Sequence, residues 1–546
     1  MLAVALESVV IAQYGPQTNL LPLDSLRSIR PEAIRAHLEF LADDALEGRA
    51  TGSRGYDVAA KYVRAQFASL GLKSGVRDGS YFQSVALRRT EVDPLASSLA
   101  IESGGRKNKL AYNKDYIVLD THAHTTGSVS APVVFAGYGV TAPDFHYDDY
   151  SGIDVKGKIV VSIGFAAPAS FPATERAYYM DGDVKQQIAR DHGAVGMILI
   201  STPENELRFK WTDVLREVKV GYNSMRWIES PDRTYGIVDG IGACALLNRS
   251  GSETRFAGES PTLAEVFSEA KGGGKTRSFA LHKTVSVRYK ARHTPVSSPN
   301  VVGVLPGSDP ELRREYVVFT AHVDHLGIGP AVDGDNIYNG ALDNAAGTAV
   351  MLEVARWFAA QPVTPKRSVA FVALTGEEEF LLGSAAFANQ SPLDGPIVAN
   401  INVDGGATTV PVRDVVAFGE EHSTLGPVAR QAASVLHMEL SSDPMPEEGG
   451  FIRSDQYSFV RTGVPALQLD LGFKSDQPGV DPLAVTKKWM VTICHSPKDD
   501  ASQSIHYESS ARFARYAALI TFSTANDPRR PEWNEGDFFG KRFAKR

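Results

Sequence analysis

The sequence predicts an α/β protein with a mixed, mostly parallel central sheet, helices on both of its faces, and a β-rich inserted domain. Two observations predict this. After residue 300, short apolar strands alternate with helices, which is typical of such sheets. Between about residues 126 and 293, short β-branched runs bounded by Gly, Pro, Asp and Ser follow one another instead.

The N-terminal segment is predicted to be helical. "PEAIRAHLEFLADDAL" begins at Pro31 and repeats apolar residues at spacings of three and four. "GYDVAAKYVRAQFASLGL" shows the same periodicity and ends at Gly71. The turn-rich stretch "EGRATGSRG" separates these two helices.

The β-rich segment contains four expected strands, in "SAPVVFAGYGV", "GKIVVSIGF", "AVGMILIST" and "TYGIVDGIGACALL". One helix, "DVKQQIARDHG", precedes the third strand. The stretch "RHTPVSSPN" is predicted to be a linker to the next region.

The C-terminal region supplies the alternating pattern. Strands are expected in "REYVVFTAHVD", "RSVAFVALTGEEE", "IVANINVDGG" and "VPALQLDLG". Helices are expected in "NAAGTAVMLEVARWFAAQ", "STLGPVARQAASVLHMEL" and "SSARFARYAALITFSTA". The final "DPRRPEWNEGDFFGKRFAKR" is polar and is predicted to be a surface tail.

Composition excludes several classes of protein. The 546 residues carry a net charge of −8, which disfavours a non-specific nucleic-acid binder. No apolar run reaches the roughly 18 residues of a membrane span. The N-terminal "MLAVALESVVIAQYG" is apolar but is a poor signal peptide, because it contains Glu7 and lacks preceding basic residues. Cys244 and Cys494 form no CxxC motif, so two buried thiols are favoured.

Acids and histidines occupy unusual places in the C-terminal region. Open α/β sheets bind ligands beyond the carboxyl ends of their strands, and five such places carry candidate residues: His322 with Asp324, Asp343, the run Glu377–Glu379, Asp404, and His495. Each has a simpler explanation, such as a helix cap for Asp343 or a solvated face for the glutamates. Together they favour one crevice.

The residue types fit a pair of divalent cations, which bind imidazoles and carboxylates and which one carboxylate can bridge. Asp324, two positions after His322, can hold the other ring nitrogen of that imidazole. The adjacent Glu377 and Glu378 point in different directions, so one can bind metal while the other acts as a base.

Several blocks resemble, in order, those of the M28 family of co-catalytic zinc peptidases, which includes aminopeptidases and glutamate carboxypeptidases: "AHVDHLG", "IYNGALDNAAGTAVMLEVAR", "GEEEFLLGS", "NINVD", "SDQYSFVRTGVPAL" and "CHSPKDD". "APVVFAGYGVTAPDFHYDDYSGIDVKGKIVV" is similar to the start of a protease-associated domain inserted in that core. The resemblance covers about residues 30 to 525.

The resemblance implies two Zn²⁺ per chain and five ligands, with His322 and Asp404 holding one ion, Glu378 and His495 the other, and Asp343 bridging both. It implies that Glu377 is the general base and acid and that Asp324 orients His322. It also implies a cis peptide between Asp343 and Asn344.

The block "GEEEFLLGS" offers three glutamates for two roles. Counting back from its "GS" pair assigns the family's two glutamates to Glu377 and Glu378 and leaves Glu379 variable. Phe380 then replaces a usual glycine, and Gln456 stands where many members have histidine. His325 is expected to remain outside the ligand set, as a possible residue of the pocket wall.

Four segments are expected on this basis. Residues 26–125 are the N-terminal part of the catalytic domain, 126–293 the inserted protease-associated domain, 294–526 the main catalytic domain, and 527–546 the polar tail. The resemblance favours an exported, periplasmic or secreted, location.

The resulting functional hypothesis is an exopeptidase that removes N-terminal amino acids from peptides. Tyr457 is a candidate donor to the oxyanion, although a tyrosine of the core or pocket wall is favoured. A carboxypeptidase or dipeptidase of the same family is the main alternative, and it needs a basic residue for a substrate carboxylate, for which Arg453 and Arg461 are candidates. An inactive binding protein on this fold, and a metal-dependent phosphatase on an unrelated scaffold, are the alternatives from other classes.

Overall fold

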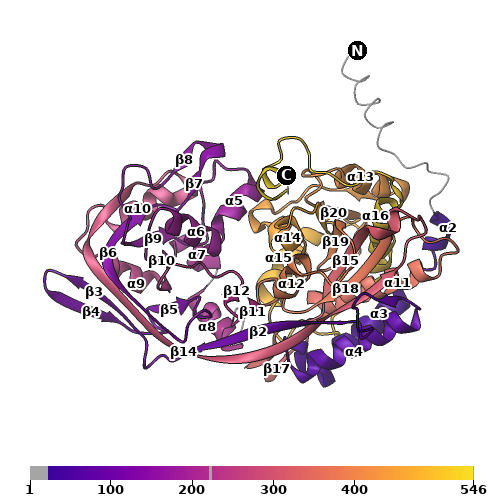
Figure 1. The fold of residues 1–546 in the computed structure, drawn as a ribbon, viewed down its shortest axis with the longest axis horizontal. Helices are drawn as coiled ribbons and strands as arrows, with labels where there is room; N and C mark the ends of the chain where they lie inside the picture. The colour runs from indigo at the N-terminus through magenta and orange to yellow at the C-terminus, as the bar shows by residue number, and fades with distance from the viewer. Residues whose placement is uncertain (1–21, 209, 221–223, 545–546) are drawn as a thin grey trace, which may run out of the picture. The chain divides into compact units, whose positions relative to one another are not determined.

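The chain folds into two compact units, and the long strand β14 (Ser278–Leu305) contributes residues to both. A computed structural model describes residues 22–208, 210–220 and 224–544, so the apolar N-terminal stretch lies outside the described residues (Figure 1). Unit 1 contains the described residues up to Val85, then Ser297–Met445, then the described residues from Gly450 onward. Unit 2 contains Ala86–Val296 with Pro446–Gly449.

Unit 1 is built on the predicted mixed, mostly parallel sheet. Its central strands run parallel in the order β18 (Ser368–Leu374), β15 (Tyr316–His322), β19 (Ile397–Val403) and β22 (Ala466–Leu471). The end of β14 (Ser278–Leu305) runs antiparallel to β18, and β20 (Asp414–Phe418) runs antiparallel to β22. Short edge strands pair with β14 and β20, namely β1 (Lys73–Ser74) and β21 (Glu439–Leu440).

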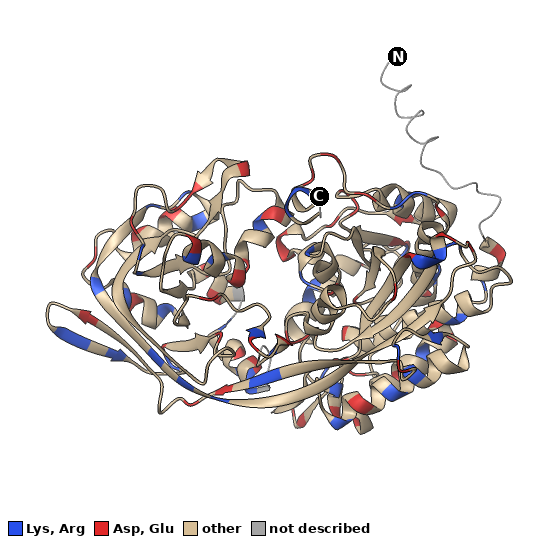
Figure 2. Cartoon of the chain, in the orientation of Figure 1, with Lys and Arg blue, Asp and Glu red and all other residues tan. Residues whose placement is uncertain are grey.

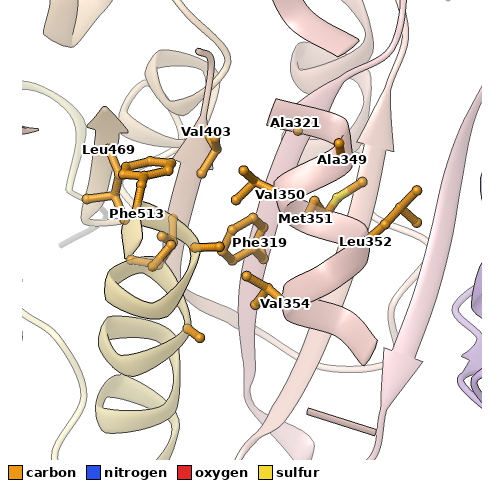
Figure 3. Close-up of a cluster of buried hydrophobic side chains, with 14 of the residues drawn as sticks. Phe319, Ala321, Ala349, Val350, Met351, Leu352, Val354, Val403, Leu469 and Phe513 are labelled. Carbon is orange, nitrogen blue, oxygen red and sulfur yellow. The ribbon is translucent and has the colours of Figure 1, made fainter. Parts of the chain in front are cut away.

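Helices pack against this sheet and share one apolar core with it. The helices that contribute most are α3 (Pro31–Leu41), α4 (Arg54–Ser69), α11 (Ala346–Ala359), α13 (Leu425–Val435) and α16 (Tyr507–Asn526). Figure 3 shows part of this core, in which Val350 of α11, Phe319 of β15 and Phe513 of α16 are buried side chains of one cluster. The shorter helices of unit 1 are α2 (Leu23–Leu26), α12 (Leu382–Asn389), α14 (Gln456–Val460), α15 (Pro482–Thr492) and α17 (Phe538–Phe543). The helices predicted from the sequence are all present.

Unit 2 contains the four predicted strands as a parallel set. They pair in the order β6 (Thr126–Ala136), β9 (Ile159–Ile163), β10 (Gly196–Ile200) and β13 (Cys244–Leu247), with β5 (Tyr116–Leu119) antiparallel to β13. The predicted helix is α6 (Gly182–Asp191). Further helices were not predicted, namely α5 (Ala173–Met180), α7 (Pro203–Arg208), α8 (Trp211–Val220), α9 (Arg249–Phe256) and α10 (Leu263–Ala270).

Two stretches near the boundaries differ from expectation. Residues 292–300, predicted to be a linker, lie within the continuous strand β14, because the fixed φ of proline suits an extended backbone. Residues 86–125 belong to unit 2, where β3 (Ser98–Ser103) pairs with β14 and β5 pairs with β13. The assignment of residues 126–293 as a protease-associated domain stays a prediction.

The C-terminal segment 527–544 is packed, although a polar surface tail was expected. Phe539 of α17 is buried, and its ring centroid lies 5.1 Å from that of His422 and 5.4 Å from that of Phe451. Asp537 caps α17 and also lies 2.6 Å from His422 Nδ1. Two adjacent phenylalanines in an otherwise polar stretch were the signal for this anchor.

The described helices differ in charge and hydropathy. Acidic and basic side chains are interspersed along α3 and α4, so neither helix presents a purely basic face (Figure 2). Within the described ranges, no helix is both long enough and apolar enough to cross a membrane.

Candidate metal centre

The predicted ligands lie at one edge of the unit 1 sheet and on the loops beside it. Their positions are His322 at the end of β15, Glu378 after β18, Asp404 after β19, Asp343 in the helical turn η6 (Ala341–Ala345) before α11, and His495 after α15. The carboxyl ends of parallel strands meet at the same edge of a sheet, and this brings together residues far apart in the sequence.

The first half of the site consists of His322, Asp343 and Asp404. His322 Nε2 lies 3.2 Å from Asp404 Oδ1 and 3.4 Å from Asp343 Oδ1. The histidine side chain is fully buried, whereas Asp404 is 24% exposed, so this half opens to solvent at Asp404.

The second half consists of Asp343, Glu378 and His495. His495 Nε2 lies 3.2 Å from Glu378 Oε2 and 3.4 Å from Asp343 Oδ2. Asp343 therefore directs one carboxylate oxygen to each half, which is the geometry expected of a bridging ligand. Cys494 Sγ lies within 4.8 Å of ligand atoms of Asp343 and His495. Cys494 is a free thiol and only partly buried, and Cys244 is a free, buried thiol.

Hydrogen bonds fix the backbone around Asp343. The carboxylate of Asp499 accepts from the backbone N–H of Leu342 at 3.0 Å and from that of Asp343 at 3.1 Å. The Asp343–Asn344 peptide is cis, as the resemblance implied. Asn344 Nδ2 donates to the carbonyl of Val403 at 3.0 Å, which ties this turn to the strand preceding Asp404.

Asp324 supports the site differently from the prediction. His322 Nδ1 lies 3.1 Å from the backbone oxygen of Asp324 and 3.9 Å from its carboxylate. The carboxylate instead accepts from the backbone N–H groups of Glu377 and Glu378, each at 3.3 Å, and from Thr51 Oγ1 at 2.9 Å. Asp324 thus orients His322 through its main chain and holds the glutamate loop through its side chain.

The two adjacent glutamates have opposite proton affinities. Burial raises the pKa of Glu377 well above its ordinary value, and the negative charges of Asp404 and Glu378 raise it further against the opposing effect of His322. Burial and Asp343 also act to raise the pKa of Glu378, but His495 and His325 outweigh them and lower it to about 2. Adjacent groups with diverging pKa values are typical of divided acid–base and ligand roles.

His325 lies at the site, although it was expected outside the ligand set. Its Nδ1 is 2.6 Å from Glu378 Oε1 and 4.0 Å from Asp343 Oδ2, and its side chain is fully buried. Its place outside the ligand set stays a prediction, but strand pairing ends at His322 and the chain beyond it brings the His325 imidazole against the predicted ligand Glu378. The only signal in the sequence was a second imidazole three positions after the first.

The residues of the "SDQY" block are mostly structural. Gln456, in place of the family's histidine, accepts from Asn402 Nδ2 at 3.0 Å and donates to the carbonyl of Phe451 at 2.9 Å. Tyr457 is buried, with its ring centroid 6.3 Å from that of Phe539, so it belongs to a packed wall. A bond from its hydroxyl to an oxyanion stays a prediction. Both candidate arginines, Arg453 and Arg461, are exposed.

The donor set fits divalent metal ions. Imidazole nitrogens and carboxylate oxygens are the ligands that zinc accepts in non-thiolate sites. In each of the sets His322–Asp343–Asp404 and His325–Asp343–Glu378, the donor atoms lie within 4.8 Å of one another. Buried carboxylates this close repel one another, and a bound cation relieves that repulsion.

Comparison with known proteins identifies the region that carries these ligands. Residues 300–521 match the sequence profile of peptidase family M28. The match covers the same blocks that resemble this family in the sequence. All five predicted ligands and Glu377 lie within this matching region.

Two curated relatives and one solved structure illustrate the similarity. A "Probable zinc metalloprotease" of Pyrenophora tritici-repentis is 27% identical over 271 residues, which are 43% of this chain and 59% of that protein. "Probable glutamate carboxypeptidase LAMP1" of Arabidopsis thaliana is 25% identical over 385 residues, covering 63% of this chain and 50% of that protein. The chain therefore spans about half the length of these relatives.

One solved structure resembles this fold over most of the chain. The aminopeptidase from Aneurinibacillus sp. strain AM-1 aligns with a TM-score of 0.51 and 18% sequence identity, over 92% of this chain and 96% of that one. At this identity the likeness concerns the fold alone.

Proposed function

We propose that the protein is an exopeptidase that releases N-terminal amino acids from peptides by means of two Zn²⁺ ions. The observation that carries the proposal is Asp343, whose two oxygens face different histidines beside the free carboxylate of Glu377. His322 and Asp404 would hold one ion, and Glu378 and His495 the other. Bound zinc supplies Lewis acidity, which activates water and polarises a carbonyl.

Glu377 is the proton carrier in this proposal. Its raised pKa suits a carboxylate that accepts a proton from the attacking water and then delivers it to the leaving amine. Its carboxylate Oε2 lies 3.9 Å from His322 Nε2, close to the first half without belonging to it. The Asp324 carboxylate accepts hydrogen bonds from the backbone N–H groups of Glu377 and Glu378, which holds the base and the ligand on one fixed stretch of backbone.

The charge of the site favours a substrate amine over a substrate carboxylate. An N-terminal ammonium needs nearby acids, and Asp404 and Glu377 are partly exposed acids at the opening. Two nearby cations are already engaged. Arg49 is buried and donates to backbone carbonyls, including those of Val323 and Gly340. Lys498 pairs with Asp333 at 2.8 Å.

The test compares zinc-reconstituted protein on aminoacyl-p-nitroanilides and on N-acetylated peptides with a free C-terminus. We expect hydrolysis of the anilides, and a loss of about 10²- to 10⁴-fold in Glu377→Gln with zinc content unchanged. Glu379→Gln is the matched control at the third glutamate, which has no assigned chemical role.

Two results would favour a different function. Cleavage of the acetylated peptides alone would favour the carboxypeptidase or dipeptidase alternative. A chain that retains no metal after careful reconstitution, and hydrolyses neither substrate, would favour the binding protein.

A further inference from the structure

The second half of the metal centre contains an imidazole that none of the expected roles uses. Glu378 Oε2 faces His495 at 3.2 Å, while Glu378 Oε1 faces His325 Nδ1 at 2.6 Å. Both oxygens of this carboxylate are therefore oriented by a histidine. A separation of 2.6 Å indicates a strong, charge-assisted hydrogen bond.

Packing holds the His325 ring in this position. A Cβ atom on Gly340 would come within 2.4 Å of His325 Cγ, so any other residue at position 340 would clash with the ring. Gly340 also has a φ of +59°, in the left-handed region that favours glycine. The ring can therefore neither swing toward residue 340 nor be displaced without moving that turn.

Arg49 fixes the two segments that enclose the ring. Its guanidinium donates to the carbonyl of Val323, two residues before His325, at 2.8 Å, and to that of Gly340 at 3.0 Å. The backbone oxygen of Arg49 accepts from the N–H of His325 at 3.3 Å. Arg49 thus fixes the backbone that carries the imidazole and also fixes Gly340, which lies against the ring.

We propose that His325 is a positioning residue that donates its Nδ1 proton to Glu378 Oε1. The bond leaves Glu378 Oε2 directed at the cation position shared with Asp343 and His495, so the second half would hold its zinc more tightly than the first. Ligating carboxylates are commonly oriented by such hydrogen bonds, and their loss weakens metal affinity about 10- to 100-fold. The inference rests on the proposed function only in taking the cation to be zinc.

The experiment measures zinc retained per chain while a chelator is titrated into the zinc-loaded protein, and it needs no substrate. In the wild type we expect two steps, one for each ion. His325→Ala should weaken the more tightly held ion about 10- to 100-fold. His325→Gln, which keeps an N–H donor, should restore most of that affinity.

The matched control is His422→Ala. His422 is a buried histidine of unit 1 whose Nδ1 lies 2.6 Å from Asp537, the same pairing away from the metal centre, and its loss should leave both steps unchanged. Thermal unfolding of the metal-free variants checks that each is folded.

Two outcomes would overturn the inference. If His325→Ala follows the His422→Ala profile, His325 does not position a ligand. If His325→Gln is as weak as His325→Ala, the imidazole binds the ion directly. Failure of the proposed function appears separately, as a zinc-loaded wild type that shows both steps but hydrolyses neither substrate.

Discussion

The two halves of the metal centre share Asp343 but are built by different parts of the fold. The first half takes His322 and Asp404 from the ends of β15 and β19, which are neighbouring strands with Thr320 opposite Asn402. The second half takes Glu378 and His495 from loops. Sheet geometry therefore positions the first half, whereas the second depends on individual hydrogen bonds.

The supporting contacts reflect this difference. Around the second half, Asp324 holds the backbone of Glu378, and His325 holds its carboxylate. In the first half, His322 Nδ1 lies 3.1 Å from the backbone oxygen of Asp324 and 3.9 Å from its carboxylate, so the main chain makes the closer contact. Side-chain substitutions in the support should therefore act mainly on the second half.

Replacing Asp343 should have the largest effect, because it removes the residue that the halves share. We expect Asp343→Ala to bind both zinc ions poorly and to lose hydrolysis by at least about 100-fold, the upper range for loss of a metal-site contact. Zinc content and anilide hydrolysis measure this. His322→Ala is the comparison, since it should release one ion and keep the other. An Asp343→Ala variant that retains both ions would show that the halves are independent.

Asp324→Asn should affect the second half of the metal centre more than the first. An asparagine oxygen can accept only part of the hydrogen bonding that Glu377, Glu378 and Thr51 now give to the carboxylate, so we expect activity to fall about 10- to 100-fold. The ion held by His322 should stay, because a backbone carbonyl orients that imidazole. Thr51→Val, which removes one donor, should show a smaller loss. If Asp324→Asn weakens the binding of both ions equally, the two halves do not differ in their support.

Asp455→Asn should produce the smallest effect, a shift in pH dependence. Glu377 acts as a base only when ionised, so activity falls as the pH drops through its pKa. Burial raises that pKa, and the negative charge of Asp455 adds to the rise. Removing the charge should lower the pKa of Glu377 and move the acid limb of kcat/KM to lower pH, by up to about one unit.

Asp470→Asn is the control for this shift. Burial raises the pKa of Asp470 to about 7, as it does for Asp455, and its main charged neighbour is Asp404. An acid limb that moves equally in both variants would mean that Glu377 does not set it.

The sequence predicted the first half of the site more completely than the second. The alternation of strands and helices predicted where acids and histidines could meet, and the family resemblance then implied His322, Asp343, Glu378, Asp404 and His495 as the ligand set, which stays a prediction. The role of His325 could not be predicted, because it depends on how the chain turns after β15 and on the space beside Gly340. The carboxylate of Asp324 was assigned to the wrong partner for the same reason, since sequence spacing does not specify side-chain direction in a loop.

Other differences arose where local polarity conflicts with tertiary packing. The C-terminal segment reads as a polar tail, yet Phe539 gives it a buried anchor. The stretch at residues 292–300 reads as a linker because of its prolines, yet it continues an extended strand. In both cases contacts with distant parts of the chain outweigh local composition.

Arg49 shows that the candidate metal centre depends on a part of the chain outside the matching region. It lies far upstream of residues 300–521, the region that matches the peptidase family, yet its guanidinium donates to the carbonyls of Val323 and Gly340 in the segments next to His322 and Asp343. A fragment trimmed to the matching region would lose this clamp and leave those carbonyls without their donor. Any experiment that isolates or exchanges the catalytic part should therefore keep the N-terminal helices attached. Two stretches of sequence that lie far apart in the chain are both needed to build the site.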